Sequence, residues 1–145
     1  MRPGGVDAEV VRRHLLGLDA ALQNLGRHAG RSLAELGADP DERWAVERGL
    51  QLCAQNVLDI ATHLAAAAGR DAPDYATAIV CLAEIGVLPA AFTERFRSVA
   101  GFRNVLVHGY LEVDLGLVHR VLNERLRDFS EFARYVEGYL ERIDQ

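Results

Sequence analysis

A stripe of apolar residues between positions 46 and 64 constrains the fold most, because it repeats at the spacing of an α-helix. Its members follow one another in alternating steps of four and three residues: Val46, Leu50, Cys53, Val57, Ile60 and Leu64. This spacing places all of them on one face of a helix. Asp39 and Pro40 are residue types that begin helices, and Glu42 stands where it can complete a capping box. The sequence therefore predicts a helix that begins after Asp39 and ends near Gly69.

Similar stripes predict further helices on both sides of this one. They are expected over about residues 7–28, 74–86, 89–109 and 114–143. The glycine-containing stretch 30–38 is expected to loosen or end the first helix, while Asp74 and Asp114 are suitable N-caps. No segment alternates with the period of two that is typical of strands. The predicted class is all-α: an antiparallel bundle of about five helices in a single domain over residues 1–145.

The apolar stripe of the last helix is longer than packing inside one chain requires. It contains Leu115, Val118, Leu122, Leu126, Phe129, Ala133, Val136, Leu140 and Ile143. We expect either part of this stripe or a face of the fourth helix to form a homodimer interface, since symmetric dimers are common among soluble proteins.

Composition and charge exclude several classes of function. The most apolar window, residues 50–68, is interrupted by polar side chains, and the N-terminus lacks the apolar core of a signal peptide, so we expect a cytoplasmic protein without a membrane span. The formal net charge of −5 argues against a broad nucleic-acid-binding face and against DNA binding, but allows a small site for one phosphate. Cys53 and Cys81 are expected to be reduced core residues. The scattered histidines predict neither a metal site nor a cofactor.

The stretch from Gly101 to Tyr110 contains the candidate site. Arg103 falls on an apolar stripe that begins at Phe92, so it must find a partner or face a cleft, because burying an unpaired guanidinium is costly. Its planar fork suits a phosphate, and Asn104 can orient it. His108, on the last turn before a glycine, is suited to proton transfer.

Arg103 and His108 do not share a helix face, because five residues turn a helix by about 140° from the starting direction. They converge only if the helix ends between them or if a second copy contributes one of them. The alternative is that Arg103 pairs with a buried acid and His108 only caps the helix.

A second polar pair, Asp59 and His63, is spaced four residues apart inside the apolar bundle. The pair either orients Arg103, lines the same cleft, or forms an ordinary surface pair. Tyr110 is either a half-buried aromatic residue or a hydroxyl that a modifying enzyme can reach.

The stretch from Arg103 to Tyr110 resembles the motif of HEPN-superfamily toxins of the HepT type, in which Arg, four residues, His, one residue and Tyr follow one another. The asparagine directly after the arginine also matches. Further similar segments occur in the same order: residues 51–63, 74–75, 82–88 and 110–114. The resemblance covers about residues 7–143.

This resemblance implies a helical homodimer with metal-independent endoribonuclease activity and a composite site near the dimer cleft. Arg103 and His108 are then the catalytic pair, with Asn104 in support. The protein is implied to be the toxin of a type VII-like toxin–antitoxin pair, which a minimal nucleotidyltransferase antitoxin neutralises by transferring AMP to Tyr110. The alternatives are an inactive helical module that binds a nucleotidyltransferase or its nucleotide substrate, and a purely structural dimerising bundle.

Overall fold

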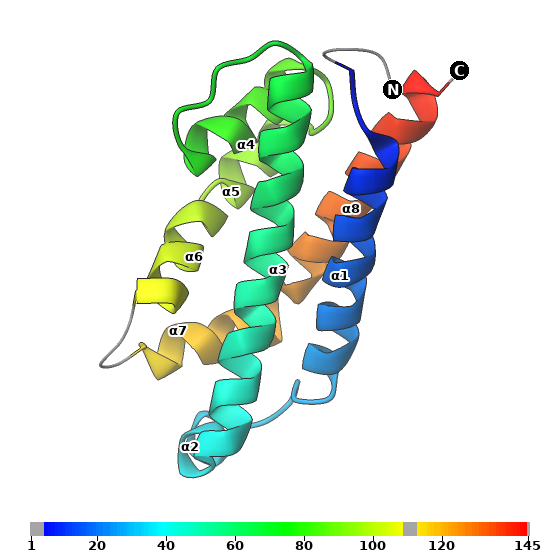
Figure 1. The fold of residues 1–145 in the computed structure, drawn as a ribbon. Helices are drawn as coiled ribbons and strands as arrows, with labels where there is room; N and C mark the ends of the chain where they lie inside the picture. Colours follow the sequence, from blue (N-terminus) through cyan, green and yellow to red (C-terminus); the bar gives the residue numbers. More distant parts are fainter. Residues whose placement is uncertain (1–4, 109–112, 145) are drawn as a thin grey trace.

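The long helix α3 (Pro40–Ala67) is the centre of the molecule, and the other helices pack around it (Figure 1). α1 (Ala8–Gly26) lies along one side of α3 and contacts α8 (Leu126–Ile143), while α6 (Val99–His108) lies along the other side. This computed structural model describes residues 5–108 and 113–144. Within these ranges all regular structure is helical, so the predicted all-α bundle is confirmed.

The beginning of α3 matches the prediction except at Glu42. The Asp39 carboxylate accepts hydrogen bonds from the backbone N–H groups of Asp41 and Glu42 at 3.1 and 3.2 Å. The side chain of Glu42 does not complete a capping box; it binds His28 at 2.7 Å and Arg31 at 3.1 Å. A charged partner within reach competes well against a backbone N–H, because charge-assisted hydrogen bonds are stronger. The Glu42 side chain therefore links the segment that follows α1 to the first turn of α3.

Replacing Asp39 with alanine is expected to lower the free energy of unfolding by about 1 kcal/mol, because two N–H groups of the first turn lose their acceptor. Urea denaturation followed by circular dichroism measures this change. Asp39→Asn is the matched control, since asparagine caps nearly as well. Equal losses in both variants would show that the carboxylate acts through its charge and not as a cap.

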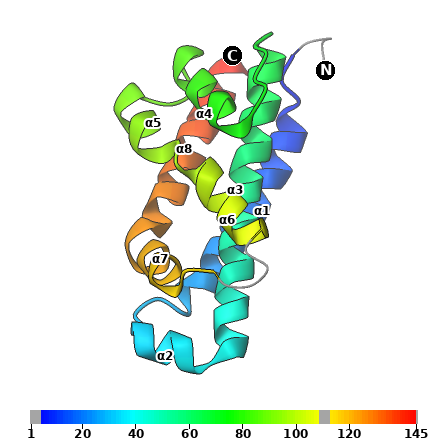
Figure 2. The same ribbon diagram turned by 90° about the vertical axis from the view of Figure 1, so that its left-hand side faces the viewer.

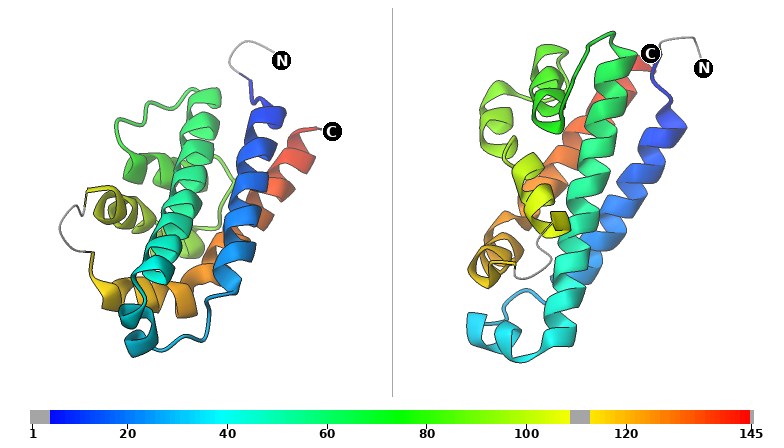
Figure 3. Two further views of the ribbon diagram at one scale, coloured as in Figure 1. Left: turned by 60° about the horizontal axis from the view of Figure 1, so that its bottom comes forward. Right: turned by 60° about the vertical axis from the view of Figure 1, so that its left-hand side comes forward.

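The stretch expected only to loosen the first helix contains a short helix, α2 (Leu33–Ala38). Ser32 and Glu35 form a reciprocal capping box at its start. Leu36 is fully buried, and α2 lies beside α7 (Leu115–Arg120) at one end of the bundle (Figure 3). The spacing of Ser32 and Glu35 is the usual sequence signature of such a start, so this helix was predictable.

The predicted fourth helix is divided in two, α5 (Ala90–Phe96) and α6. Phe96 stacks on Phe92 with ring centroids 4.9 Å apart and on Phe132 of α8 at 5.3 Å. These aromatic contacts fix α5 against α8, while α6 follows α3 in another direction (Figure 2). The break at residues 97–98 therefore allows α6 to bring Arg103 to α3. The prediction of one continuous helix was wrong at this point.

The predicted last helix is also interrupted. α7 leads into a π-helical segment, η1 (Val121–Arg125), and then into α8. A π-turn inserts an extra residue and rotates the helix face that follows. Beyond it, Phe129, Val136 and Leu140 of the predicted stripe are buried, Phe132 and Asp128 are buried although neither belongs to that stripe, and Ile143 is exposed.

The remaining predictions agree with the fold. α4 (Tyr75–Glu84) is capped by Asp74, which accepts a hydrogen bond from the Thr77 backbone at 2.7 Å, and Asp114 caps α7 in the same way. Cys53 and Cys81 are buried and free. In the part of the chain that the structure describes, no helix has the length and apolar character that a membrane span requires.

Candidate functional site

Arg103 occupies a half-buried position on α6, where it is held by three neighbours. Its Nε donates a hydrogen bond to Oε1 of Gln55 on α3 at 3.0 Å, and Nη1 donates to Oδ1 of Asn104 at 3.2 Å. The guanidinium carbon lies 5.4 Å from the centre of the Tyr75 ring at the start of α4, within cation–π range. The predicted conflict between a charged residue and an apolar stripe is thus resolved by polar and aromatic partners from other helices.

Gln55 is in turn oriented by Asp59, one helical turn further along α3. The Gln55 amide nitrogen donates a hydrogen bond to Asp59 Oδ1 at 2.8 Å. Because this bond points the amide nitrogen towards Asp59, the amide oxygen faces Arg103. Asp59 therefore reaches Arg103 through Gln55 and not directly. The sequence analysis did not identify Gln55 as the partner of Arg103, although it lies four residues before Asp59.

His63 bonds to a different part of the molecule. Its Nε2 accepts a hydrogen bond from the backbone N–H of Asp7 at 3.0 Å, where Asp7 is the N-cap of α1. Two further helical turns separate His63 from Gln55 along α3, and the direction of its side chain has rotated towards α1. This hydrogen bond links the start of α1 to α3.

The other predicted site residues lie at the edge of the described part of the chain. His108 is the last residue of α6, and only its backbone is described. Its side chain and the whole of Tyr110 lie outside the described part of the chain. α6 is nevertheless helical without interruption from Val99 to His108. The helix therefore does not end between Arg103 and His108, which was one of the two ways in which they were expected to converge.

Other chemistry is limited in the described ranges. No group of three or more His, Cys, Asp or Glu side chains there could hold a metal ion. Burial raises the pKa of Cys53 to about 12, so this thiol is protonated at neutral pH and is a poor nucleophile.

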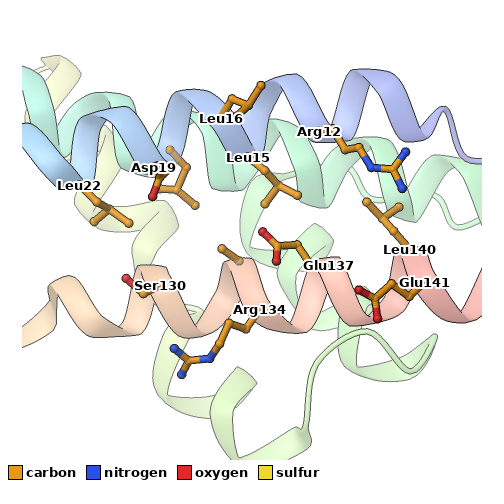
Figure 4. Close-up of a pocket in the computed structure, with 12 residues that line it drawn as sticks. Arg12, Leu15, Leu16, Asp19, Leu22, Ser130, Arg134, Glu137, Leu140 and Glu141 are labelled. Atoms are coloured by element: carbon orange, nitrogen blue, oxygen red, sulfur yellow. The ribbon is translucent and has the colours of Figure 1, made fainter.

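A groove of about 710 Å³ lies between α1 and α8 and is separate from this site. Leu15 of α1 and Glu137 of α8 point towards each other across it (Figure 4). None of the predicted site residues lines it. It lies beyond α3 from α6, so it does not extend the surroundings of Arg103 (Figure 1).

Losing the Gln55 contact is expected to reduce any activity that depends on Arg103. In Gln55→Leu the guanidinium loses its acceptor on α3, and misplacement of a binding group by about 1 Å can cost about 100-fold in rate. We expect a loss of about 10- to 100-fold in that activity with little change in thermal stability. In an Arg103→Ala background the same substitution is expected to add nothing, because coupled residues are not additive. An equal loss in both backgrounds would show that Gln55 acts independently of Arg103.

Comparison with known proteins places the chain in a family. The model of the family described as Ribonuclease HepT-like matches residues 18–136. The chain belongs to this family. It is 29% identical over 90 residues to the mRNA nuclease HepT of Shewanella oneidensis, an alignment that covers 61% of this chain and 68% of that protein. It is 22% identical over 142 residues to the tRNA nuclease HepT of Aphanizomenon flos-aquae, covering 97% and 96%. The predicted ribonuclease of the HepT type is thereby confirmed.

Solved structures confirm the HEPN-like fold of this HepT-like protein. A toxin–antitoxin structure with AMP-PNP superposes with a TM-score of 0.80 at 20% identity, covering 90% of this chain and 98% of that one. A tri-AMPylated HEPN toxin of Shewanella oneidensis in complex with MNT antitoxin gives 0.79 at 20% identity, covering 89% and 97%. YutE of Bacillus subtilis, a cytosolic protein of unknown function, gives 0.81 at 19% identity, covering 94% and 92%. At these identities the likeness concerns the fold alone.

Proposed function

We propose that this HepT-like protein is a toxin that cleaves RNA without a metal ion, with Arg103 and His108 at the cleavage site. The observation that carries the proposal is the way Arg103 is held. Gln55 and Asn104 accept from Nε and Nη1, and Nη2 has no hydrogen-bond partner among the described residues. A guanidinium fixed on one side in this manner presents its remaining N–H groups to a phosphate without losing further conformational freedom.

The proposed reaction is an attack by the ribose 2′-oxygen on the adjacent phosphodiester. His108 removes the 2′-hydroxyl proton, the 2′-oxygen forms a bond to phosphorus, and the bond to the 5′-oxygen breaks as that oxygen takes up a proton from water. The protonated His108 then returns its proton to the solvent. His108 serves as the proton-transfer group, since imidazole changes its protonation state near neutral pH. Arg103 stabilises the negative charge that builds up on the phosphate oxygens. The products are a 2′,3′-cyclic phosphate and a 5′-hydroxyl end.

We propose further that two copies of the chain complete the site. Five residues of a regular helix turn by about 140°, so the backbone of α6 does not place positions 103 and 108 on one face, which supports a site that a second copy completes. A homodimer that brings the α6 helices together across a two-fold axis places Arg103 of one copy near His108 of the other.

The proposed regulator is a minimal nucleotidyltransferase antitoxin that attaches AMP to Tyr110. The solved relatives support this role, because one is a tri-AMPylated HEPN toxin with its MNT antitoxin. AMP attached two residues after His108 would add bulk and negative charge near the proposed cleavage site, which opposes RNA binding. We propose that the protein acts as one domain in the cytoplasm, on RNA and not on DNA or membranes.

The test is cleavage of total RNA by the purified protein in excess EDTA, beside His108→Ala. We expect discrete fragments from the unsubstituted protein and a loss of about 10²- to 10⁴-fold in the variant, with unchanged thermal unfolding. Intact mass spectrometry beforehand establishes that Tyr110 carries no AMP. An unmodified protein that cleaves no RNA but binds a nucleotidyltransferase would instead identify a non-catalytic binding module.

A further inference from the structure

The exposed face of α3 contains an aromatic residue that the proposed cleavage site does not use. Trp44, the only tryptophan of the chain, is 61% exposed. Trp44, Arg48, Gln51 and Gln55 follow one another in steps of four, three and four residues. Eleven residues of helix return to within about 20° of the starting direction and advance by about 16 Å. Trp44 therefore lies on the same face of α3 as Gln55, the residue that holds Arg103.

Arg48 lies between Trp44 and Gln55 on this face and is exposed. Within the described ranges it forms no ion pair, in contrast to Arg43, whose Nε lies 3.8 Å from Glu47. Its charge is thus open to an external anion. The indole of Trp44 and the guanidinium of Arg48 therefore lie along the face of α3 that leads to Gln55, and Gln55 contacts Arg103 of α6.

We propose that this face of α3 binds single-stranded RNA on one side of the scissile phosphate, with Trp44 stacking on a base and Arg48 binding a phosphate. The proposal rests on the proposed ribonuclease function. Single-stranded nucleic acids are bound by grooves that combine basic residues with exposed aromatic platforms, over about 4–16 nucleotides. The separation of about 16 Å between Trp44 and Gln55 is within the length of such a strand.

The charge of the molecule limits the ways in which RNA can bind to it. With a formal net charge of −5, the surface as a whole repels RNA, so affinity must come from a few local contacts. Base stacking supplies affinity that does not depend on net charge. The exposed helical neighbours of Trp44, Asp41 and Arg48, are charged, so this face lacks the continuous apolar surface that the core of a protein–protein interface has.

Because Trp44 is the only tryptophan, its fluorescence reports directly on this face. The probe is a 2′-O-methylated single-stranded oligonucleotide of about 12 nucleotides, which binds but lacks the 2′-hydroxyl proton that cleavage requires. We expect titration to quench the emission of the unsubstituted, unmodified protein. With binding measured by anisotropy of a labelled oligonucleotide, Trp44→Leu is expected to weaken affinity by about 5- to 150-fold, and Trp44→Phe to retain most of it. Arg48→Ala is expected to reduce the slope of log K against log salt by about 0.7.

Two exposed residues on other faces are the matched controls. Leu16→Ala on α1 and Arg127→Ala on α8 remove an exposed apolar and an exposed basic side chain away from α3, and we expect neither to change RNA binding. With cleavable RNA, Trp44→Leu is expected to raise KM while leaving kcat nearly unchanged, because stacking far from the reacting bond binds substrate and transition state equally.

Three results would overturn the inference. The subsite would be refuted if Trp44→Leu cleaved RNA with an unchanged KM and the oligonucleotide did not quench the fluorescence of the unsubstituted protein. The ribonuclease proposal would then remain intact. Concentration-dependent protection of Trp44 from iodide in the absence of RNA would show that a second copy covers this face. Absence of both cleavage and binding in the unmodified protein would remove the ribonuclease proposal and the subsite together.

Discussion

Arg103→Lys is expected to reduce RNA cleavage by about 10²- to 10³-fold, the loss that follows removal of a single donor to a developing negative charge. Lysine retains the positive charge but lacks the planar fork of arginine. Its ammonium group cannot donate at the same time to Gln55, to Asn104 and to a phosphate in the arrangement seen here. The comparison measures how much of the effect of Arg103 comes from geometry and how much from charge.

The measurement is kcat/KM on a defined RNA oligonucleotide in EDTA, with urea denaturation of each variant. We expect stability to change little, since Arg103 is half-buried and the aliphatic part of lysine can replace its packing. Arg127→Lys, at an exposed position on α8, is the matched control and is expected to keep full activity. If Arg103→Lys cleaved as well as the unsubstituted protein, the charge alone would suffice, and the fork held by Gln55 would have no role in the reaction.

The features of the fold that sequence predicted are those determined by neighbouring residues. Asp39, Asp74 and Asp114 each begin a helix as expected, because an N-cap acts on N–H groups two or three positions further along the chain. The α3 stripe is buried as its spacing predicts, since periodicity is a local property.

The features that sequence did not predict depend on contacts between distant helices. The break between α5 and α6 carries no proline, and it follows from the stacking of Phe96 on Phe132 of α8. The π-helical segment likewise has no local signature in the chain, and Asp128 is buried beside Arg125 of that segment and Arg95 of α5, which is distant in sequence.

The same distinction applies to the candidate site. The sequence indicated that Arg103 needs a partner, because of its position on an apolar stripe, but the identity of that partner depends on how α6 is rotated against α3. Gln55 and Tyr75 are therefore found only in the structure. His63 lies about two helical turns beyond Gln55, so its side chain points in another direction along α3. It therefore bonds to Asp7 at the start of α1 and not to a group near Arg103.

Mixing two inactive variants is expected to restore RNA cleavage if two copies complete the site. In a heterodimer of Arg103→Ala with His108→Ala, one site contains the intact Arg103 of the second variant and the intact His108 of the first. The other site lacks both groups. We therefore expect about half the activity of the unsubstituted dimer from such heterodimers, compared with losses of about 10²-fold or more in each variant alone.

Coexpression with two different affinity tags isolates the mixed dimer, and cleavage of a labelled RNA measures its activity. An Arg103→Ala homodimer carrying both tags controls for purification. If each chain contained its own complete site, every chain of the mixed dimer would lack one of the two groups and no activity would return. Because α6 is helical through to His108, the structure favours restoration, and a silent mixed dimer with normal stability would mean that the two side chains meet within one chain.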